Sequence, residues 1–106
     1  MLDALRLSDL LKPLAATLNG VDTHFDSVSI DARKVARGGL FVALPGSRSN
    51  GHDFVAQARE NGAAAAMVEY LVDDPLQQLL VHDCQLALGQ LGALVRDQFR
   101  GTVIGI

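Results

Sequence analysis

The residues best suited to binding an anion gather in one part of the sequence. From Ala32 to His52 there are four basic side chains and no acidic one, so this window carries +4 while the rest of the chain carries −7. The four are Arg33, Lys34, Arg37 and Arg48. A local basic window in an acidic chain is a reasonable anion site, although charge alone favours a solvated basic face.

The same window contains the turns that could shape such a site. Gly38-Gly39 forms one turn, and a polar loop from Ser47 to Gly51 follows Pro45-Gly46 and opens a predicted helix. Backbone N–H groups in this loop and at the helix start near Gly51-His52 can bind phosphate oxygens. Arg33 and Arg48 would add charge-assisted hydrogen bonds. The residues therefore predict a site for an anion or a nucleotide phosphate.

Other kinds of chemistry find little support in the sequence. His24, His52 and His82 are far apart and lack acidic or Cys neighbours at metal-ligand spacing, so no metal site is predicted. Cys84 directly follows Asp83, a predicted helix cap, and is expected to be a small core residue. Neither a nucleophile elbow nor the phosphate loop G-x-x-x-x-G-K-[ST] occurs, so the chain itself is expected to bind no ATP.

Three helices are predicted around these residues. The first is capped by Ser8, follows Leu10, Leu11, Leu14 and Leu18 along one face and ends at Asn19-Gly20. The second runs from about His52 to Asn61, has Phe54, Val55 and Ala58 on its apolar side and stops at Gly62. The third is capped by Asp83 and runs to about Phe99, with Leu88, Leu91 and Val95 on its apolar face. It carries Gly89 and Gly92, whose spacing would let another backbone approach closely.

The predicted strands alternate with these helices. They are Phe25–Ile30, Leu40–Leu44, Ala64–Glu69, Leu79–Val81 and Thr102–Ile106. The run Leu40–Leu44 is continuously apolar, which is typical of a strand buried on both faces. The order predicts a single small α/β domain with a mixed or mostly parallel sheet of about five strands and helices packed on it.

Composition sets the class of protein. With 106 residues, 49% of them apolar, the chain is expected to fold around one core. The net charge of −3 argues against a general nucleic-acid binder. The sequence shows no signal peptide or membrane span and has one cysteine, which favours the cytoplasm. Because it stops within an apolar strand, we expect it to be a piece of a longer protein.

Three motifs in the basic window resemble the N-terminal domain of the Mur ligases. They are Ser29–Val35, Gly38–Gly46 and Asn50–Phe54, which are similar to the family patterns D-[ST]-R, G-[DC]-L-F-[VI]-A-x-x-G and D-[GA]-H-[DE]-F. The segments 58–68 and 79–99 also fit. The resemblance therefore covers nearly the whole chain. It implies that residues 1–106 are the N-terminal substrate-binding domain, with a central ATPase domain and a C-terminal domain outside this sequence.

The resemblance also implies a function. Members of the family use ATP and Mg²⁺ to activate a substrate carboxylate as an acyl phosphate, which an amine then attacks to form an amide. This chain is most similar to the members that add D-alanyl-D-alanine to UDP-N-acetylmuramoyl-tripeptide in peptidoglycan synthesis. Its partners would be the UDP-N-acetylmuramoyl-peptide and the central domain, while the fragment itself would be inactive and bind no ATP or metal. The alternatives are the member that adds the third peptide residue, or a non-catalytic nucleotide-sensing or interaction module.

Family contacts to the UDP end of the substrate can be placed on individual residues. They fall on Ile30, on Ala32 with Arg33 beside it, and on Ser47, Arg48 and Ser49. The family usually has Ser or Thr where this chain has Ala32, so one hydroxyl hydrogen bond is missing, and backbone N–H groups or the hydroxyl of Ser29 would have to replace it. The family usually has Asp at the position of Asn50, which still suits a turn.

Overall fold

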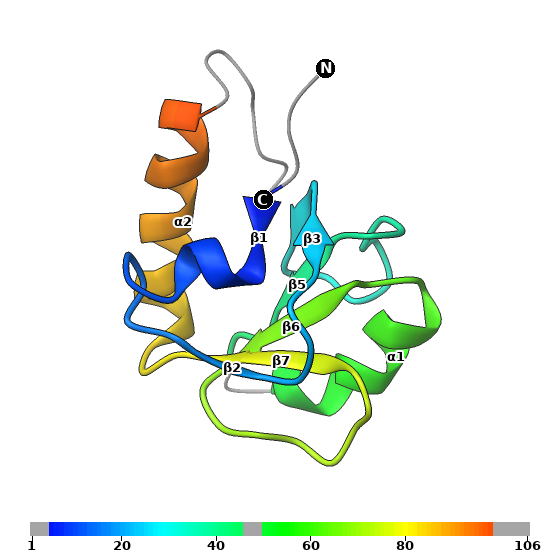
Figure 1. Ribbon diagram of the computed structural model, residues 1–106. Coiled ribbons are helices and arrows are strands. Elements are labelled where there is room, and N and C mark those ends of the chain that lie inside the picture. Colours follow the sequence, from blue (N-terminus) through cyan, green and yellow to red (C-terminus); the bar gives the residue numbers. More distant parts are fainter. Residues whose placement is uncertain (1–4, 46–49, 99–106) are drawn as a thin grey trace.

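Four parallel strands form the centre of the fold (Figure 1). The computed structural model describes residues 5–45 and 50–98, with only the main chain for Leu5 and 94–98. The strands lie in the order β2-β7-β6-β5-β4, and β2 runs antiparallel to β7. Their bounds are Thr17–Asn19 (β2), Val28–Ser29 (β4), Leu40–Val42 (β5), Ala65–Val68 (β6) and Gln77–Leu80 (β7). The prediction of a five-stranded, mostly parallel mixed sheet is confirmed.

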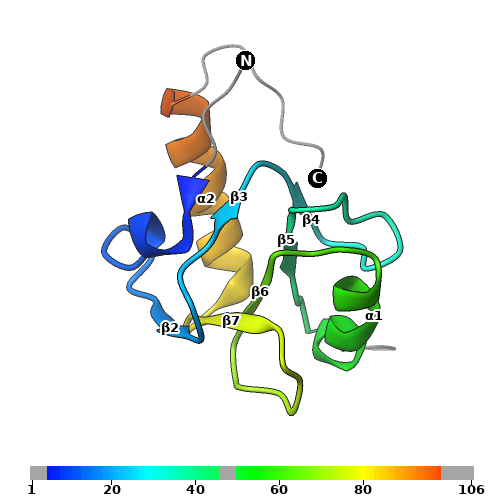
Figure 2. The same cartoon turned by 45° about the vertical axis from the view of Figure 1, so that its right-hand side comes forward.

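Helices cover both faces of this sheet. On one face lie α2 (Cys84–Gln98) and a 3-10 turn, η1 (Leu7–Leu10), and on the other lie α1 (Val55–Glu60) and the 3-10 turn η2 (Gly51–Phe54) (Figures 1 and 2). A separate two-stranded antiparallel sheet joins β1 (Leu5–Arg6) to β3 (His24–Phe25). None of the helices within the described ranges is long and apolar enough to cross a membrane.

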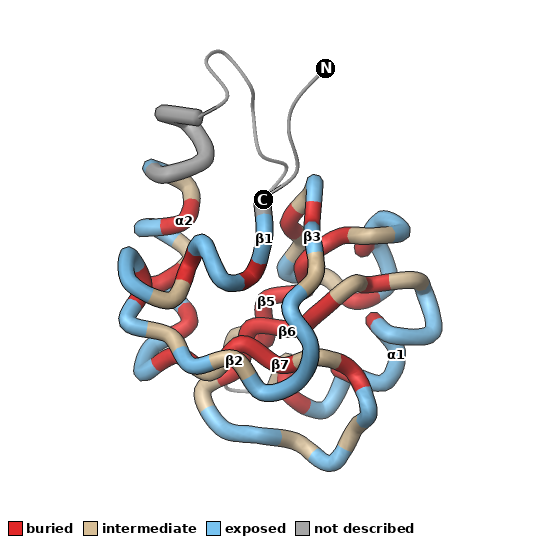
Figure 3. Tube along the Cα trace, viewed as in Figure 1, coloured by how far each residue is buried: buried red, intermediate tan, exposed pale blue. Residues whose placement is uncertain are grey.

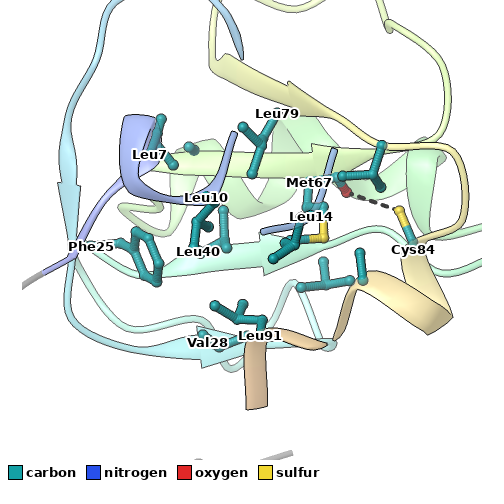
Figure 4. Close-up of a cluster of buried hydrophobic side chains, with 14 residues drawn as sticks. Leu7, Leu10, Leu14, Phe25, Val28, Leu40, Met67, Leu79, Cys84 and Leu91 are labelled. Carbon is teal, nitrogen blue, oxygen red and sulfur yellow. Dashed lines mark hydrogen bonds between the residues drawn. The ribbon is translucent and has the colours of Figure 1, made fainter. Parts of the chain in front are cut away.

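The central strands are buried on both faces (Figure 3). In β5, Leu40 and Val42 pack in a cluster beside α2, whereas Phe41 packs in a second cluster with the α1 residues Val55 and Ala58. The first cluster also contains Leu7, Leu10, Phe25, Met67 and Leu91 (Figure 4). The expectation that Leu40–Leu44 is a strand buried on both sides is therefore confirmed for its first three residues.

The predicted first helix is wrong. The helical turn stops at Leu10, and Leu18 lies in β2 rather than on a helix. Pro13 explains the break, because proline lacks an N–H and disfavours the helical conformation of the residue before it. Ala15 then has a left-handed φ of 50°. Ser8 lies inside η1, and its hydroxyl donates to Asp22 Oδ2 at 2.8 Å instead of capping a helix.

The predicted strand Phe25–Ile30 is two strands. β3 ends at Phe25 and pairs with β1, whereas β4 begins at Val28 and pairs with β5. Because the two strands belong to different sheets, the chain changes direction at Asp26 and Ser27. Ile30 then lies beyond the end of β4, which leaves it free to face the solvent.

The other two helices are close to their predicted bounds. The second begins as a 3-10 turn before α1, and Gly62 follows it with φ +102°. Asp83 caps α2, since its Oδ1 accepts from Leu86 N–H at 3.1 Å. A Cβ at Gly89 or Gly92 would have no described atom within 4 Å outside its own stretch of helix, so no described backbone approaches closely there. The predicted strand Thr102–Ile106 lies outside the described residues.

Candidate functional site: a pocket at the ends of two strands

A pocket of about 710 Å³ opens at the carboxyl ends of β4 and β5. In sheets of parallel strands this is the usual place for a ligand. Its lining comes from the turn after β4, from β5 and the residue Leu44 beyond it, and from η2 and α1: Ser29, Ile30, Asp31, Ala32, Arg33, Lys34, Phe41, Leu44, Gly51, Phe54 and Gln57. The pocket thus unites residues from all three motifs.

The turn after β4 is held by its own hydrogen bonds. Ser29 Oγ accepts from Asp31 N–H at 3.1 Å and donates to the Asp31 carbonyl at 3.0 Å. Asp31 Oδ1 accepts from Arg33 N–H at 2.9 Å, and the Asp31 carbonyl accepts from Lys34 N–H at 3.0 Å. The Ser29 hydroxyl is therefore already engaged, and these N–H groups point into the turn rather than toward a ligand.

Asp31 and Arg33 form an ion pair at the pocket. Arg33 Nε lies 3.2 Å from Asp31 Oδ1, and Arg33 Nη2 lies 3.2 Å from Asp31 Oδ2. The hydrogen bonds from Arg33 hold the pKa of Asp31 below its ordinary value, and those same bonds raise the pKa of Arg33. Much of the positive charge of Arg33 is thereby balanced by Asp31. The other cation of the lining, Lys34, forms no ion pair with a carboxylate of the described residues.

Two apolar side chains are left partly exposed in the pocket. Ile30 is 44% exposed and Phe54 is 39% exposed, and both line it. The prediction placed Phe54 on the core side of its helix together with Val55 and Ala58, but only those two are buried. Phe54 and Gln57 share the pocket-facing side instead. Spacing alone could not separate the two pairs, because Val55 and Ala58 are also three residues apart and Phe54 is four residues from Ala58.

The start of the second helix does not offer free N–H groups. Gly51 N–H donates to the Leu44 carbonyl at 2.9 Å, and Asp53 N–H donates to the Asn50 carbonyl at 2.9 Å. His52 N–H donates to Asn50 Oδ1 at 3.0 Å. The expectation that phosphate oxygens bind the N–H groups near Gly51-His52 therefore does not fit the structure.

The structure brings together three of the six predicted contact residues. Ile30, Ala32 and Arg33 all line the pocket. Ala32 is nevertheless mostly buried in the cluster beneath it, and its carbonyl accepts from Asn61 Nδ2 at 2.8 Å. The other three, Ser47, Arg48 and Ser49, lie outside the described residues.

Cys84 belongs to the core, as expected. Its thiol is buried and donates to the Met67 carbonyl at 3.6 Å (Figure 4). Burial raises its pKa to about 12, so little thiolate forms near neutral pH. Within residues 5–45 and 50–98, no group of three or more His, Cys, Asp or Glu side chains is placed to hold a metal ion.

Comparison with known proteins shows to which family this chain belongs. The profile of the Mur ligase family, catalytic domain, matches residues 24–94. The chain is 44% identical over 100 residues to the UDP-N-acetylmuramoyl-tripeptide–D-alanyl-D-alanine ligase of Escherichia coli K12, which covers 94% of this chain. This chain belongs to the Mur ligase family. It spans only about a fifth of the length of the curated Mur ligases that it matches, 22% for the E. coli protein.

Solved Mur ligases share the fold. A crystal structure of MurF from Acinetobacter baumannii matches 93% of this chain and 22% of its own, with a TM-score of 0.81 and 35% identity. MurF from Thermotoga maritima, solved in complex with ADP, matches 76% of this chain with a TM-score of 0.63 and 32% identity. A Mur ligase named for adding 2,6-diaminopimelate, from Geobacter sulfurreducens, is 37% identical over 89% of this chain.

Proposed function

We propose that this chain binds the UDP-N-acetylmuramoyl end of the substrate for a ligase that adds D-alanyl-D-alanine to UDP-N-acetylmuramoyl-tripeptide. In this proposal residues 1–106 are the substrate-binding domain of a longer enzyme, and other domains supply the catalysis. The observation that carries the proposal is the pocket at the ends of β4 and β5 in a chain of the Mur ligase family. Such ligases carry out a step of peptidoglycan synthesis.

The pocket has the chemistry of a nucleoside-diphosphate site. The partly exposed Ile30 and Phe54 offer an apolar surface to a flat base. Lys34 and Arg33 offer positive charge to the diphosphate. Because the N–H groups of Asp31, Arg33 and Lys34 are used within the turn, side chains rather than these amides would carry the diphosphate contacts on this edge. Gln57 adds a neutral donor and acceptor for sugar hydroxyl groups.

The predicted loop contacts complete this proposal. Ser47, Arg48 and Ser49 are assigned to the UDP end by the family resemblance, in which they lie between the second and third motifs, and Arg48 is the cation that we expect to contribute most. Losing one charge-assisted hydrogen bond should cost roughly 1.5–3 kcal/mol, or about ten- to a hundredfold in affinity. Ile30, Ala32 and Arg33 line the described part of the pocket.

The choice of reaction within the family follows the relatives. The E. coli relative at 44% identity and the A. baumannii structures are named for adding D-alanyl-D-alanine or as MurF. The relative from Geobacter, at 37%, is named for adding diaminopimelate, so the ligase that adds the third residue is the second candidate. Both substrates share a UDP-N-acetylmuramoyl end. The two candidates therefore differ in the peptide attached to that end and in the amine that the complete enzyme accepts.

ATP and Mg²⁺ would serve the complete enzyme, where ATP supplies the phosphoryl group that activates the carboxylate. The residues here do not fit either group: the sequence lacks the phosphate-loop motif, and the described residues lack a metal-binding cluster. No step through ATP or Mg²⁺ falls on these residues. We place the reaction in the cytoplasm, since a lone, buried thiol suits a reducing compartment.

A calorimetric titration of this chain with UDP-N-acetylmuramic acid tests the proposal. We expect weak binding that Arg48→Ala reduces by about ten- to a hundredfold. Arg37→Ala is the matched control, because Arg37 belongs to the basic window but does not line the pocket. Equal losses from both substitutions would mean that only diffuse charge matters. NMR shifts that cluster away from Ile30–Lys34 would show that the site is misplaced.

A further inference from the structure

His52 is a buried motif residue that the pocket does not use directly. It is 4% exposed and does not line the pocket, although Gly51 before it and Phe54 after it do. Its ring stacks on Tyr70, with centroids 4.1 Å apart and planes 9° from parallel. A histidine in this position therefore acts on the pocket through the backbone of η2 or not at all.

The hydrogen bonds around the imidazole specify one tautomer. Glu69 N–H lies 2.9 Å from Nε2, and because an amide can only donate, Nε2 must accept. Nδ1 therefore carries the proton and donates to Asn50 Oδ1 at 2.6 Å. Asn50 Nδ2 in turn donates to Tyr70 Oη at 2.7 Å, which fixes the orientation of the amide. Every polar atom of the ring is satisfied only when His52 is neutral.

This cluster holds the edge of the pocket at a tight contact. Gly51 N–H donates to the Leu44 carbonyl, and both residues line the pocket. A Cβ on Gly51 would lie 2.6 Å from Leu44 N and 2.9 Å from Ala43 Cα. The two backbone segments thus meet with no space to spare, and a small shift of η2 would move the pocket wall. On the other side of His52, Glu69 also anchors α2, because its Oε2 accepts from Cys84 N–H at 2.8 Å.

We propose that neutral His52 is a positioning residue, which fixes the pocket edge formed by Leu44 and by Gly51 to the end of β6. The affinity of the pocket for its ligand then depends on the protonation state of His52. The inference rests on the proposed function only for the identity of the ligand. Protonation would place an N–H on Nε2 opposite Glu69 N–H, which removes the bond that ties η2 to the sheet.

The direction of the pH dependence follows from the surroundings of the ring. Burial lowers the pKa of His52 below its ordinary value of 6.5, although the nearby carboxylates of Glu69 and Asp53 act in the opposite direction. The hydroxyl-bearing ring of Tyr70 also faces His52 and stacks on it. Neutral His52 therefore stabilises the fold fully above pH 6.5, and this stabilisation is lost as the pH falls from 6.5 through the lowered pKa.

Two substitutions separate hydrogen bonding from ring packing. His52→Phe keeps a ring against Tyr70 but loses both hydrogen bonds, whereas His52→Gln supplies one donor and one acceptor and does not titrate. With UDP-N-acetylmuramic acid at about pH 7.5, we expect His52→Phe to bind about five- to tenfold more weakly and His52→Gln to stay within about threefold of the parent. The diphosphate of this probe is a diester and does not titrate in the range used.

A pH series supplies the readout that a merely structural role would not change. Between about pH 7.5 and pH 5, the affinity of the parent chain should fall about five- to tenfold more than that of His52→Gln. His24 and His82 are present in both chains, so the difference belongs to His52. Superimposable pH profiles, or parent-like binding by a folded His52→Phe, would overturn the proposal. If His52→Phe does not fold, the parent and His52→Gln carry the test.

A ligand-free measurement keeps this proposal separate from the proposed function. Long-range ¹⁵N–¹H correlation of the His52 ring at about pH 7.5 should place the proton on Nδ1. Exchange of Gly51 N–H should be faster in His52→Phe than in the parent or in His52→Gln. A proton on Nε2, or unchanged exchange in His52→Phe, would refute the positioning role even if the ligand binds. Failure of the parent to bind the probe would instead count against the proposed function alone.

Discussion

The two edges of the pocket are built in opposite ways. The edge at Asp31–Lys34 is charged and open to solvent, and the side chain of Arg33 is 75% exposed in its ion pair with Asp31. The edge at Gly51 is neutral and held from behind by His52, which is buried and hydrogen-bonded at both ring nitrogens. An exposed ion pair is weakened by water and salt, whereas a buried network is costly to leave half-satisfied.

This difference assigns different work to the two edges. In the proposed function the charged turn would attract the anion, and its geometry depends on local hydrogen bonds within a few residues. The neutral edge gives the pocket its shape, because its position depends on the hydrogen bond between His52 and Glu69. Glu69 directly follows β6 and lies far from this edge in the sequence. We therefore expect substitutions at the Gly51 edge to change stability and affinity together. Substitutions at the Asp31 edge should change affinity and its salt dependence with little effect on stability.

The largest effect should come from Gly51→Ala. The new methyl group would lie 2.6 Å from Leu44 N and 3.0 Å from Ala43 C, which are backbone atoms that cannot swing aside. We expect a loss of about 1–3 kcal/mol in the free energy of unfolding, measured by urea denaturation. Binding of UDP-N-acetylmuramic acid should weaken as well, since the methyl group displaces the pocket edge.

Gly89→Ala is the matched control for that substitution. A Cβ there meets no other described atom within 4 Å, so the change should stabilise α2 by about 0.5–1 kcal/mol through helix propensity. If Gly51→Ala proved as stable as Gly89→Ala, the close backbone contact would not exist and the contrast between the two edges would fail.

The sequence could predict those features that depend on residues close together along the chain. The buried strand at Leu40 and the caps at Gly62 and Asp83 depend on residue types close together, and these predictions are confirmed. The helix predicted through Leu18 is wrong because the prediction gave the apolar spacing more weight than Pro13. In the structure the proline interrupts the helix.

The site shows the same division. The turn at Asp31–Lys34 was predicted to line an anion pocket, because its charges and motif are adjacent in sequence. Ile30, Ala32 and Arg33 do line a pocket, and its preference for an anion stays a prediction. The hydrogen bonds of His52 could not be predicted, since its partner Glu69 follows β6 and lies far from it in the sequence. Likewise, Phe54 looks like a core residue until the direction of its helix against the sheet is known.

A smaller effect is expected from Asp31→Asn. The Asn oxygen can still accept from Arg33 N–H and hold the turn, but the negative charge that balances Arg33 is removed. Affinity for UDP-N-acetylmuramic acid should rise about two- to fivefold at low salt and less at high salt. Asp73→Asn, which removes an exposed charge outside the pocket, should change the affinity little. Weaker binding by Asp31→Asn would mean that Asp31 contacts the ligand itself.

The smallest effect should come from Ala32→Ser, which restores the hydroxyl group usual in the family. The Ala32 side chain is mostly buried beneath the pocket beside Val35 and Phe41, so the new hydroxyl has limited access to a ligand. The Ala32 carbonyl keeps its bond from Asn61, so the turn should not move. We expect an affinity that is unchanged or up to about threefold tighter in the same titration. Ala36→Ser, a substitution at an exposed site outside the pocket, provides the baseline. A gain in affinity of tenfold or more would show that one hydroxyl outweighs the charges of this edge. A loss of affinity would show that the apolar packing under the turn matters more than either.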